Sequence, residues 1–252
     1  MQDPREKLIY SIVFLIIWAA IKLLIFIIKE IKAKNKAKKR LELSEFIIDP
    51  SLSQEEKLEM IEDLIKKEDY DKAIELCNEI LKKDENCAMA YCLKAQALFY
   101  GPLETEEAVE FATRAIELDP NIALTYLIRA NAGSWDDRSN ELQMEDYNKA
   151  LELDSNYSEA YLNRGRLKLD LDDSKGAVED FNSAIETDPN NPEAYFERAE
   201  IKYKLKDYYA ALIDYEKTLL YNPRDISARI KRTLCFFKTG QIFKGIISVF
   251  GK

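Results

Sequence analysis

Two consecutive segments of the chain, residues 159–190 and 193–224, carry nearly the same pattern of side chains. Their tyrosine, small-residue and proline positions fall 34 residues apart, in the pairs Tyr161/Tyr195, Gly165/Ala199, Ala177/Ala211, Phe181/Tyr215 and Pro189/Pro223. A fixed period of this length is typical of stacked structural repeats, in which each copy buries its apolar face against its neighbours. This period constrains the fold more than any other feature of the sequence.

Each copy of the period is predicted to form two short amphipathic helices. In the first helix, Tyr161, Gly165 and Leu169 are four residues apart and therefore share one face. In the second, the aromatic Phe181 lies among alanines at helical spacing, so that small side chains let the two helices approach and the ring fills the gap between them. The pair Asn191-Pro192 is predicted to cap and start the next helix.

These residues and their spacing resemble the tetratricopeptide-repeat family, whose units are helix-turn-helix hairpins of 34 residues. The resemblance implies an all-α fold, a right-handed superhelix or α-solenoid. Departures are local: Asp172 and Lys206 stand where the family has a turn glycine, and Gln143 stands where a small residue is usual. Carried along the chain, the register predicts a repeat domain over 51–252 with units at 54–87, 88–122, 123–157, 158–191 and 192–225 and a partial unit at 226–252.

A transmembrane helix is predicted before the repeats, after a short tail at 1–7. Leu8–Ile28 is a stretch of 21 residues in which Ser11 and Lys22 are the main polar side chains. A helix of that length spans about 31 Å, enough for a bilayer core. Lys22 lies near one end, where its ammonium can reach the headgroups. A cleaved signal peptide, an interfacial helix and a buried core helix are weaker alternatives, because the start is not cationic, the stretch is apolar all round and stacked repeats do not obviously wrap a helix.

Charge sets the expected orientation. The linker at 29–50 begins with Lys29–Arg40, which holds seven basic residues and one acidic residue. Under the positive-inside rule this flank stays in the cytoplasm, so we expect a single-pass protein with its N-terminus outside and its repeats in the cytoplasm. Residues 54–252 hold 27 basic and 40 acidic residues, a net charge of −13, which argues against nucleic acid as a partner.

No catalytic or metal-binding pattern emerges. The chain has no histidine, so histidine-based triads and histidine metal sites are excluded. Its seven glycines form no phosphate-binding loop, and its acidic clusters lie where helices start or turn. The cysteines, at 77, 87, 92 and 235, form no CxxC pair and are predicted to be small core residues. We therefore expect neither an enzyme nor a cofactor.

Binding is the expected role, because stacked helical hairpins present their first helices along a concave surface. The resemblance implies that a peptide or protein partner contacts first-helix positions just after the turn proline. These are Cys92, Gln96, Phe99, Leu127, Asn131, Leu162, Arg166, Leu169, Phe196, Glu200 and Tyr203. The apolar members could equally serve in packing, whereas Asn131 and Arg166 are the better ligand candidates. The lysines of the family's chaperone-binding clamp are missing.

The last residues suggest a second surface. Ile247 and Phe250 belong to an apolar stretch at 242–250 that we expect to contact a partner or a second copy of the chain. The function expected from the sequence is a membrane-anchored adaptor that tethers an unknown protein or peptide. The alternative is an accessory protein of envelope assembly with the anchor inverted and the repeats outside. Labelling of Cys92 or Cys235 in intact cells is expected to distinguish the two.

Overall fold

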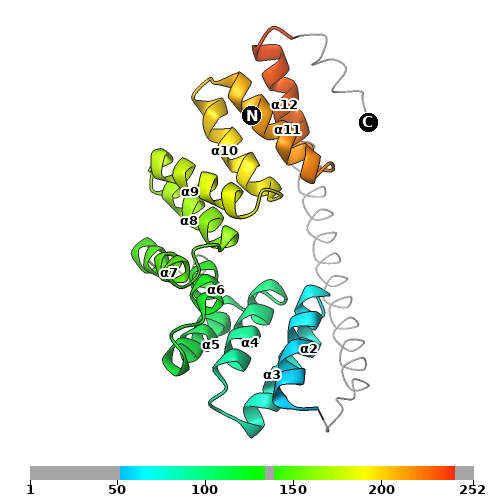
Figure 1. The fold of residues 1–252 in the computed structure, drawn as a ribbon, viewed down its shortest axis with the longest axis vertical. Helices are drawn as coiled ribbons and strands as arrows, with labels where there is room; N and C mark the ends of the chain where they lie inside the picture. The colour runs from blue at the N-terminus through cyan, green and yellow to red at the C-terminus, as the bar shows by residue number, and fades with distance from the viewer. Residues whose placement is uncertain (1–51, 134–138, 242–252) are drawn as a thin grey trace, which may run out of the picture. The chain divides into compact units, whose positions relative to one another are not determined.

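The computed structural model describes residues 52–133 and 139–241, which form an all-α array of eleven helices (Figure 1). The helices are α2 Gln54–Lys66, α3 Tyr70–Lys83, α4 Ala88–Tyr100, α5 Thr105–Leu118, α6 Ala123–Gly133, α7 Asn140–Leu153, α8 Ser158–Asp170, α9 Ser174–Thr187, α10 Pro192–Lys204, α11 Tyr208–Tyr221 and α12 Ile226–Lys238. None of these described helices is both long and apolar enough to cross a membrane. The predicted span Leu8–Ile28, the linker at 29–50 and the residues Ile247 and Phe250 lie outside the described residues.

Each helix packs against the next one along the chain, as Figure 1 shows. The pairs α2/α3, α4/α5, α6/α7, α8/α9 and α10/α11 are helix-turn-helix units, and α12 follows them. First helices of neighbouring units also touch, since α4 contacts α6 and α8 contacts α10. The predicted array of helix-turn-helix units is therefore confirmed, and its first helices lie side by side.

The described turns inside the units each contain one residue with left-handed backbone. Asp172 and Lys206 have φ values of 63° and 64°, and Glu68 has 60° in the first unit. After α8, the N–H groups of Asp172 and Asp173 donate to the carbonyls of Leu169 and Lys168, so the turn satisfies the last helical acceptors. The two side chains that replace the family's glycine thus keep the glycine conformation.

The turns between units share an Asp-x-Asn pattern. The carboxylates of Asp84, Asp119, Asp154 and Asp188 each accept a hydrogen bond from the backbone N–H two residues later, at 2.9–3.1 Å. This local bond holds the chain in a turn after α3, α5, α7 and α9. Asn191 then caps α10 by accepting from the N–H groups of Glu193 and Ala194, which confirms the predicted cap.

The core inside a unit forms where a small residue faces an aromatic ring. Gly165 on α8 faces Phe181 on α9, and a Cβ atom at Gly165 would lie 2.6 Å from the ring. Phe181 is fully buried. The close approach of the two helices that the sequence predicts is confirmed, because no larger residue than glycine fits here unless the ring moves.

Three arginine–aspartate bridges join the two helices of successive units. Arg129, Arg164 and Arg198 on first helices each form a bidentate ion pair with a buried aspartate on the second helix, namely Asp146, Asp180 and Asp214. Arg164 and Arg198 also donate to Asn148 and Asn182 on the second helix of the preceding unit, at 2.7 and 2.6 Å. Each of these two guanidinium groups therefore holds three helices in one register.

Candidate functional site

A groove of about 800 Å³ runs across the first helices α4, α6, α8 and α10, and we call it the α4–α10 groove. Its walls mix aromatic rings, carboxamides and charged groups. The side chains on which its chemistry depends are Phe99, Tyr100, Asn131, Glu159, Asn163 and Arg166. A concave site of this size, with polar groups set among aromatic rings, has the dimensions of a ligand site.

Helix α8 supplies the central wall through one polar stripe. Glu159, Asn163, Arg166 and Asp170 all line the groove, and their spacing of four, three and four residues places them on the same helix face. The opposite face of α8 packs into the core through Gly165. The stripe therefore points outward because the small residue fixes the inward face.

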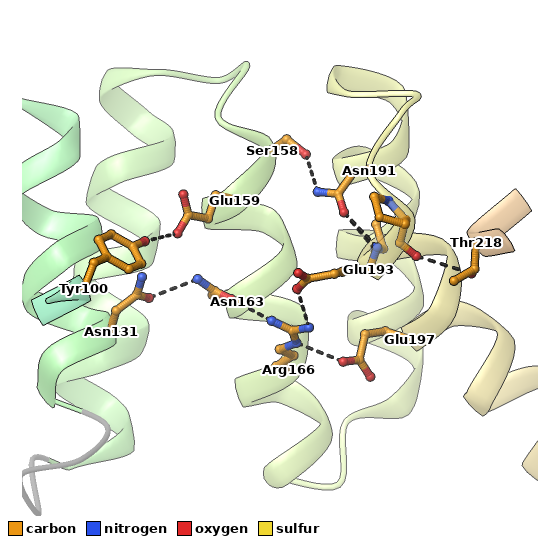
Figure 2. A network of polar contacts seen from close by, with 12 residues as sticks. Tyr100, Asn131, Ser158, Glu159, Asn163, Arg166, Asn191, Glu193, Glu197 and Thr218 are labelled. Carbon is orange, nitrogen blue, oxygen red and sulfur yellow. Dashed lines mark hydrogen bonds and ion pairs between the residues drawn. The ribbon is translucent and has the colours of Figure 1, made fainter. Parts of the chain in front are cut away.

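A chain of hydrogen bonds crosses the groove floor from α7 to α8, as Figure 2 shows in part. The Oδ1 atom of Asn131 accepts from the Tyr147 hydroxyl at 2.8 Å and from Asn163 Nδ2 at 3.1 Å. The Oδ1 atom of Asn163 in turn accepts from Arg166 at 3.3 Å. These bonds fix the rotamers of Asn131, which is buried, and of Asn163, which is half-buried.

Arg166 is held by two carboxylates on α10. Its guanidinium donates to Glu193 at 2.8 Å and to Glu197 at 2.9 Å (Figure 2). Burial acts against the charge, but the attraction and hydrogen bonds of Glu197 and Glu193 outweigh it, so the pKa of Arg166 is raised. Among the described residues, Arg166 is the only arginine that lines the groove. Its charge is balanced by these two carboxylates, which leaves little positive charge for an anionic ligand.

Glu159 lies in a different environment. The hydroxyl of Tyr100, on α4, donates a hydrogen bond to it (Figure 2). Burial and the Glu159 charge raise the pKa of Tyr100, and the same two causes raise the pKa of Tyr147 and Tyr157. These three tyrosines line the groove beside Glu159 and stay neutral at physiological pH.

Four of the residues predicted to contact a partner are brought together in the groove, namely Phe99, Asn131, Leu162 and Arg166. Leu162 is buried in the core formed with Ala177 and Phe181, and it reaches the groove only at its floor. Both residues expected to be the better ligand candidates, Asn131 and Arg166, lie in the groove wall. Each of them already has protein partners.

The other predicted contact residues lie elsewhere. Cys92 and Leu127 are completely buried and reach neither solvent nor the groove. Gln96 and Leu169 are partly buried outside the groove lining. Phe196 and Tyr203 pack against the core cluster of α10, α11 and α12, which contains Tyr215. Glu200 accepts from the Tyr215 hydroxyl and pairs with Lys231 at 2.7 Å.

Sequence reasoning missed Tyr100, Tyr147 and Glu159 as groove residues. The outward stripe of α8, which starts at Glu159, is visible in the sequence as polar residues at helical spacing and could have been found. Tyr100 could not, because its contact with Glu159 joins residues 59 positions apart in units that are not adjacent. A pattern that repeats every 34 residues carries no information on such a contact.

The cysteines are core residues, as predicted. All four are buried and free. Burial raises the pKa of Cys77 to about 12 and that of Cys92 and Cys235 to about 11, so these thiols stay protonated and unreactive at neutral pH. The expectation that labelling of Cys92 or Cys235 would report their location is therefore wrong for the folded chain. Within residues 52–133 and 139–241, no group of histidine, cysteine or acidic side chains could hold a metal ion.

Comparison with known families identifies the repeats. Models described as "Tetratricopeptide repeat" match residues 58–121 and 192–225, and a model described as "TPR repeat" matches residues 165–206. A search of curated proteins gave no significant match.

Solved structures share the fold at low sequence identity. PilF of Pseudomonas aeruginosa has a TM-score of 0.66 at 17% identity, with 76% of this chain and 85% of that chain covered. A thermophilic TPR protein of Thermus thermophilus has a TM-score of 0.59 at 19% identity, with 73% and 100% covered. YrrB, described as a TPR protein with an unusual peptide-binding site, has a TM-score of 0.55 at 19% identity, with 68% and 88% covered. These likenesses concern the fold alone.

Proposed function

We propose that this chain, a tetratricopeptide-repeat protein and thus a non-catalytic interaction scaffold, binds an extended segment of a partner protein in the α4–α10 groove. The observation that carries the proposal is the groove itself, about 800 Å³ in volume and lined by aromatic rings, carboxamides and carboxylates. The unusual peptide-binding site of YrrB is a property of that protein, and it agrees with this use of the fold.

The groove chemistry favours a peptide over a small apolar ligand. Carboxamides can donate and accept at the same time, as peptide groups do, so the amide of a side chain can pair with the backbone of an extended segment. Asn163 is half-buried in the groove wall, with its orientation fixed by Asn131 and Arg166. A rigid amide of this kind loses little conformational entropy when a ligand binds.

The proposal includes a membrane anchor. Leu8–Ile28 would cross the bilayer once, with the basic flank at Lys29–Arg40 and the repeats on the cytoplasmic side. In this arrangement the chain is an adaptor that holds its partner near the membrane. The support is the sequence of the segment and its flanking charges.

Selection from a random peptide library tests the groove. We expect phage-displayed peptides selected on the purified full-length chain to converge on one motif. The selected synthetic peptide should bind about tenfold more weakly to Asn163→Ala than to the original chain, because one fixed amide is lost from the contact. Lys175→Ala is the matched control, since Lys175 is exposed on α9 outside the groove. Absence of any enriched motif, or equal binding to both variants, would overturn the proposal.

A further inference from the structure

The carboxylate of Glu159 differs from the carboxylates that hold the array together through ion pairs. Asp146, Asp180 and Asp214 each pair with an arginine, and Glu200 pairs with Lys231. Glu159 has no cationic partner among the described residues, and its hydrogen bond comes from the neutral Tyr100 hydroxyl. A partly buried carboxylate without a countercharge has lost part of its hydration, and an added cation would restore that loss.

The surroundings of Glu159 suit a cation. Tyr100, Tyr147 and Tyr157 line the groove on its three neighbouring elements, α4, α7 and the turn before α8. The Tyr100 hydroxyl donates to the Glu159 carboxylate, and all three tyrosines line the same groove as that carboxylate. Burial and then the Glu159 charge raise the pKa of each tyrosine, in keeping with this arrangement. Aromatic faces attract ammonium and guanidinium groups, most strongly where water is partly excluded.

The charge of the whole groove points the same way. Four carboxylates line it, at Glu159, Asp170, Asp188 and Glu193, against the single guanidinium of Arg166. That guanidinium is already paired with Glu193 and Glu197. An acidic ligand would be repelled by these carboxylates and would find the arginine already paired, whereas a basic ligand would meet the Glu159 carboxylate, which has no cationic partner among the described residues, and a favourable long-range field.

We propose that Glu159 and the tyrosines at 100, 147 and 157 form a subsite for a lysine or arginine side chain of the bound segment. The inference rests on the proposed function, because it names one side chain of the partner segment that the α4–α10 groove holds. The ammonium or guanidinium group pairs with the Glu159 carboxylate, and the aliphatic stem lies against the tyrosine rings. The partner is therefore a protein with a basic residue in an extended, accessible segment.

The test compares peptide selections on two forms of the full-length chain. Phage-displayed random peptides selected on the original chain should carry lysine or arginine at one fixed position of the motif. The same library selected on Glu159→Gln should lose that preference, and the original peptide should bind about tenfold more weakly to this variant. Glu186→Gln is the control, since Glu186 is exposed on α9 away from the groove. Tyr100→Leu is a second variant that removes a ring and leaves the carboxylate, and it should also weaken binding.

A double-mutant cycle then assigns the contact. Replacing the basic residue of the selected peptide by norleucine should weaken binding to the original chain about tenfold and should change binding to Glu159→Gln little, because the pair is already broken. Additive losses would overturn the subsite. A selected motif without lysine or arginine would also overturn the subsite, and so would an equal preference for a basic residue on Glu159→Gln. In both cases the proposal that the groove binds a peptide would stand. If no peptide binds at all, both proposals fail together.

Discussion

At the scale of single residues, the arginine–aspartate bridges explain how charges are accommodated in the interior of the array. Arg129, Arg164 and Arg198 occupy equivalent positions in three successive units. Their aspartate partners expose between 2% and 5% of their side chains. Removing these charges from water costs free energy that offsets most of the attraction within each pair, so a bridge adds little net stability. A buried aspartate without its arginine would be strongly unfavourable, and each bridge therefore fixes which two helices pair.

Removing one partner of a bridge is expected to be strongly destabilising. Arg198→Met should lower the free energy of unfolding by about 3 kcal/mol, because it leaves the buried Asp214 with Lys202 alone. Urea unfolding followed by circular dichroism measures the loss. Arg114→Met is the control, because Arg114 pairs with Glu117 on the surface and the change should stay below about 1 kcal/mol. Equal losses in the two variants would show that the buried bridge is no stronger than the surface pair.

At the scale of elements, the turns inside the units store a small amount of backbone strain. Asp172 and Lys206 lie 34 residues apart and both have positive φ values, and Gly240 lies a further 34 residues on with φ 76°. A side chain in this conformation brings Cβ close to the carbonyl oxygen, which costs about 1–2 kcal/mol for residues other than glycine. Of these three positions, only Gly240 carries glycine, the residue that adopts a positive φ without this cost.

Exchanging residues within this series should change stability in opposite directions. We expect Lys206→Gly to stabilise the chain by about 1 kcal/mol, because relief of the left-handed strain exceeds the extra entropy of glycine in the unfolded chain. Gly240→Lys should destabilise it by a similar amount, and within the described part of the chain no heavy atom lies within 4 Å of a Cβ placed at Gly240. Thermal unfolding of both variants measures the two shifts. A shift of the same sign in both would contradict the account.

The elements could be predicted from the sequence more completely than the groove. The helix pairs follow from local signals, namely the Tyr161, Gly165 and Phe181 spacing and the Asn191-Pro192 cap, which act within one unit. The groove depends on how units stack. Tyr100 contacts Glu159 across an intervening unit. Leu127 is buried in the core, although its position in the repeat predicted that it would contact a partner. Such features arise from side-chain packing between units, which no single repeat encodes.

At the scale of the whole molecule, the buried tyrosines make stability depend on alkaline pH. Burial raises the pKa of Tyr147 and Tyr215 above the ordinary value of 10.0, helped by Glu159 in the first case and by Glu200 in the second. In the unfolded chain these hydroxyls ionise near pH 10, while in the folded chain they keep their protons. The folded state therefore binds more protons, and its stability is fully present below pH 10 and falls as the pH rises above it.

The loss above pH 10 should approach about 1.4 kcal/mol per pH unit for each of these two tyrosines. Urea unfolding at a series of alkaline pH values measures the slope, and tyrosinate absorbance should rise together with the loss of helical signal. Tyr215→Phe should make the slope less steep, since phenylalanine cannot ionise in the unfolded chain. Tyr209→Phe, at an exposed position on α11, serves as the control. An unchanged slope in Tyr215→Phe would exclude this residue as the source.

The proposed membrane anchor and its orientation also belong to the scale of the whole molecule, and their test needs an exposed thiol. The native cysteines are all buried, and burial raises the pKa of Cys77, Cys92 and Cys235, so we expect them not to react with maleimides in the folded state. Ser155 is exposed in the turn between α7 and α8, where a cysteine disturbs no helix. With the basic flank at Lys29–Arg40 in the cytoplasm, a membrane-impermeant maleimide should label Ser155→Cys only after the cells are permeabilised.

Gln2→Cys supplies the matched control for that experiment, because it lies before the predicted span. It should be labelled in intact cells, since the residues before Leu8 carry no net charge that would hold them inside. The reverse pattern, with Ser155→Cys labelled in intact cells and Gln2→Cys protected, would place the repeats outside and favour the inverted accessory protein. Labelling of both variants in intact cells would contradict a single crossing at Leu8–Ile28. The charge asymmetry around that segment, from zero before it to strongly positive after it, is the reason why we expect the first pattern.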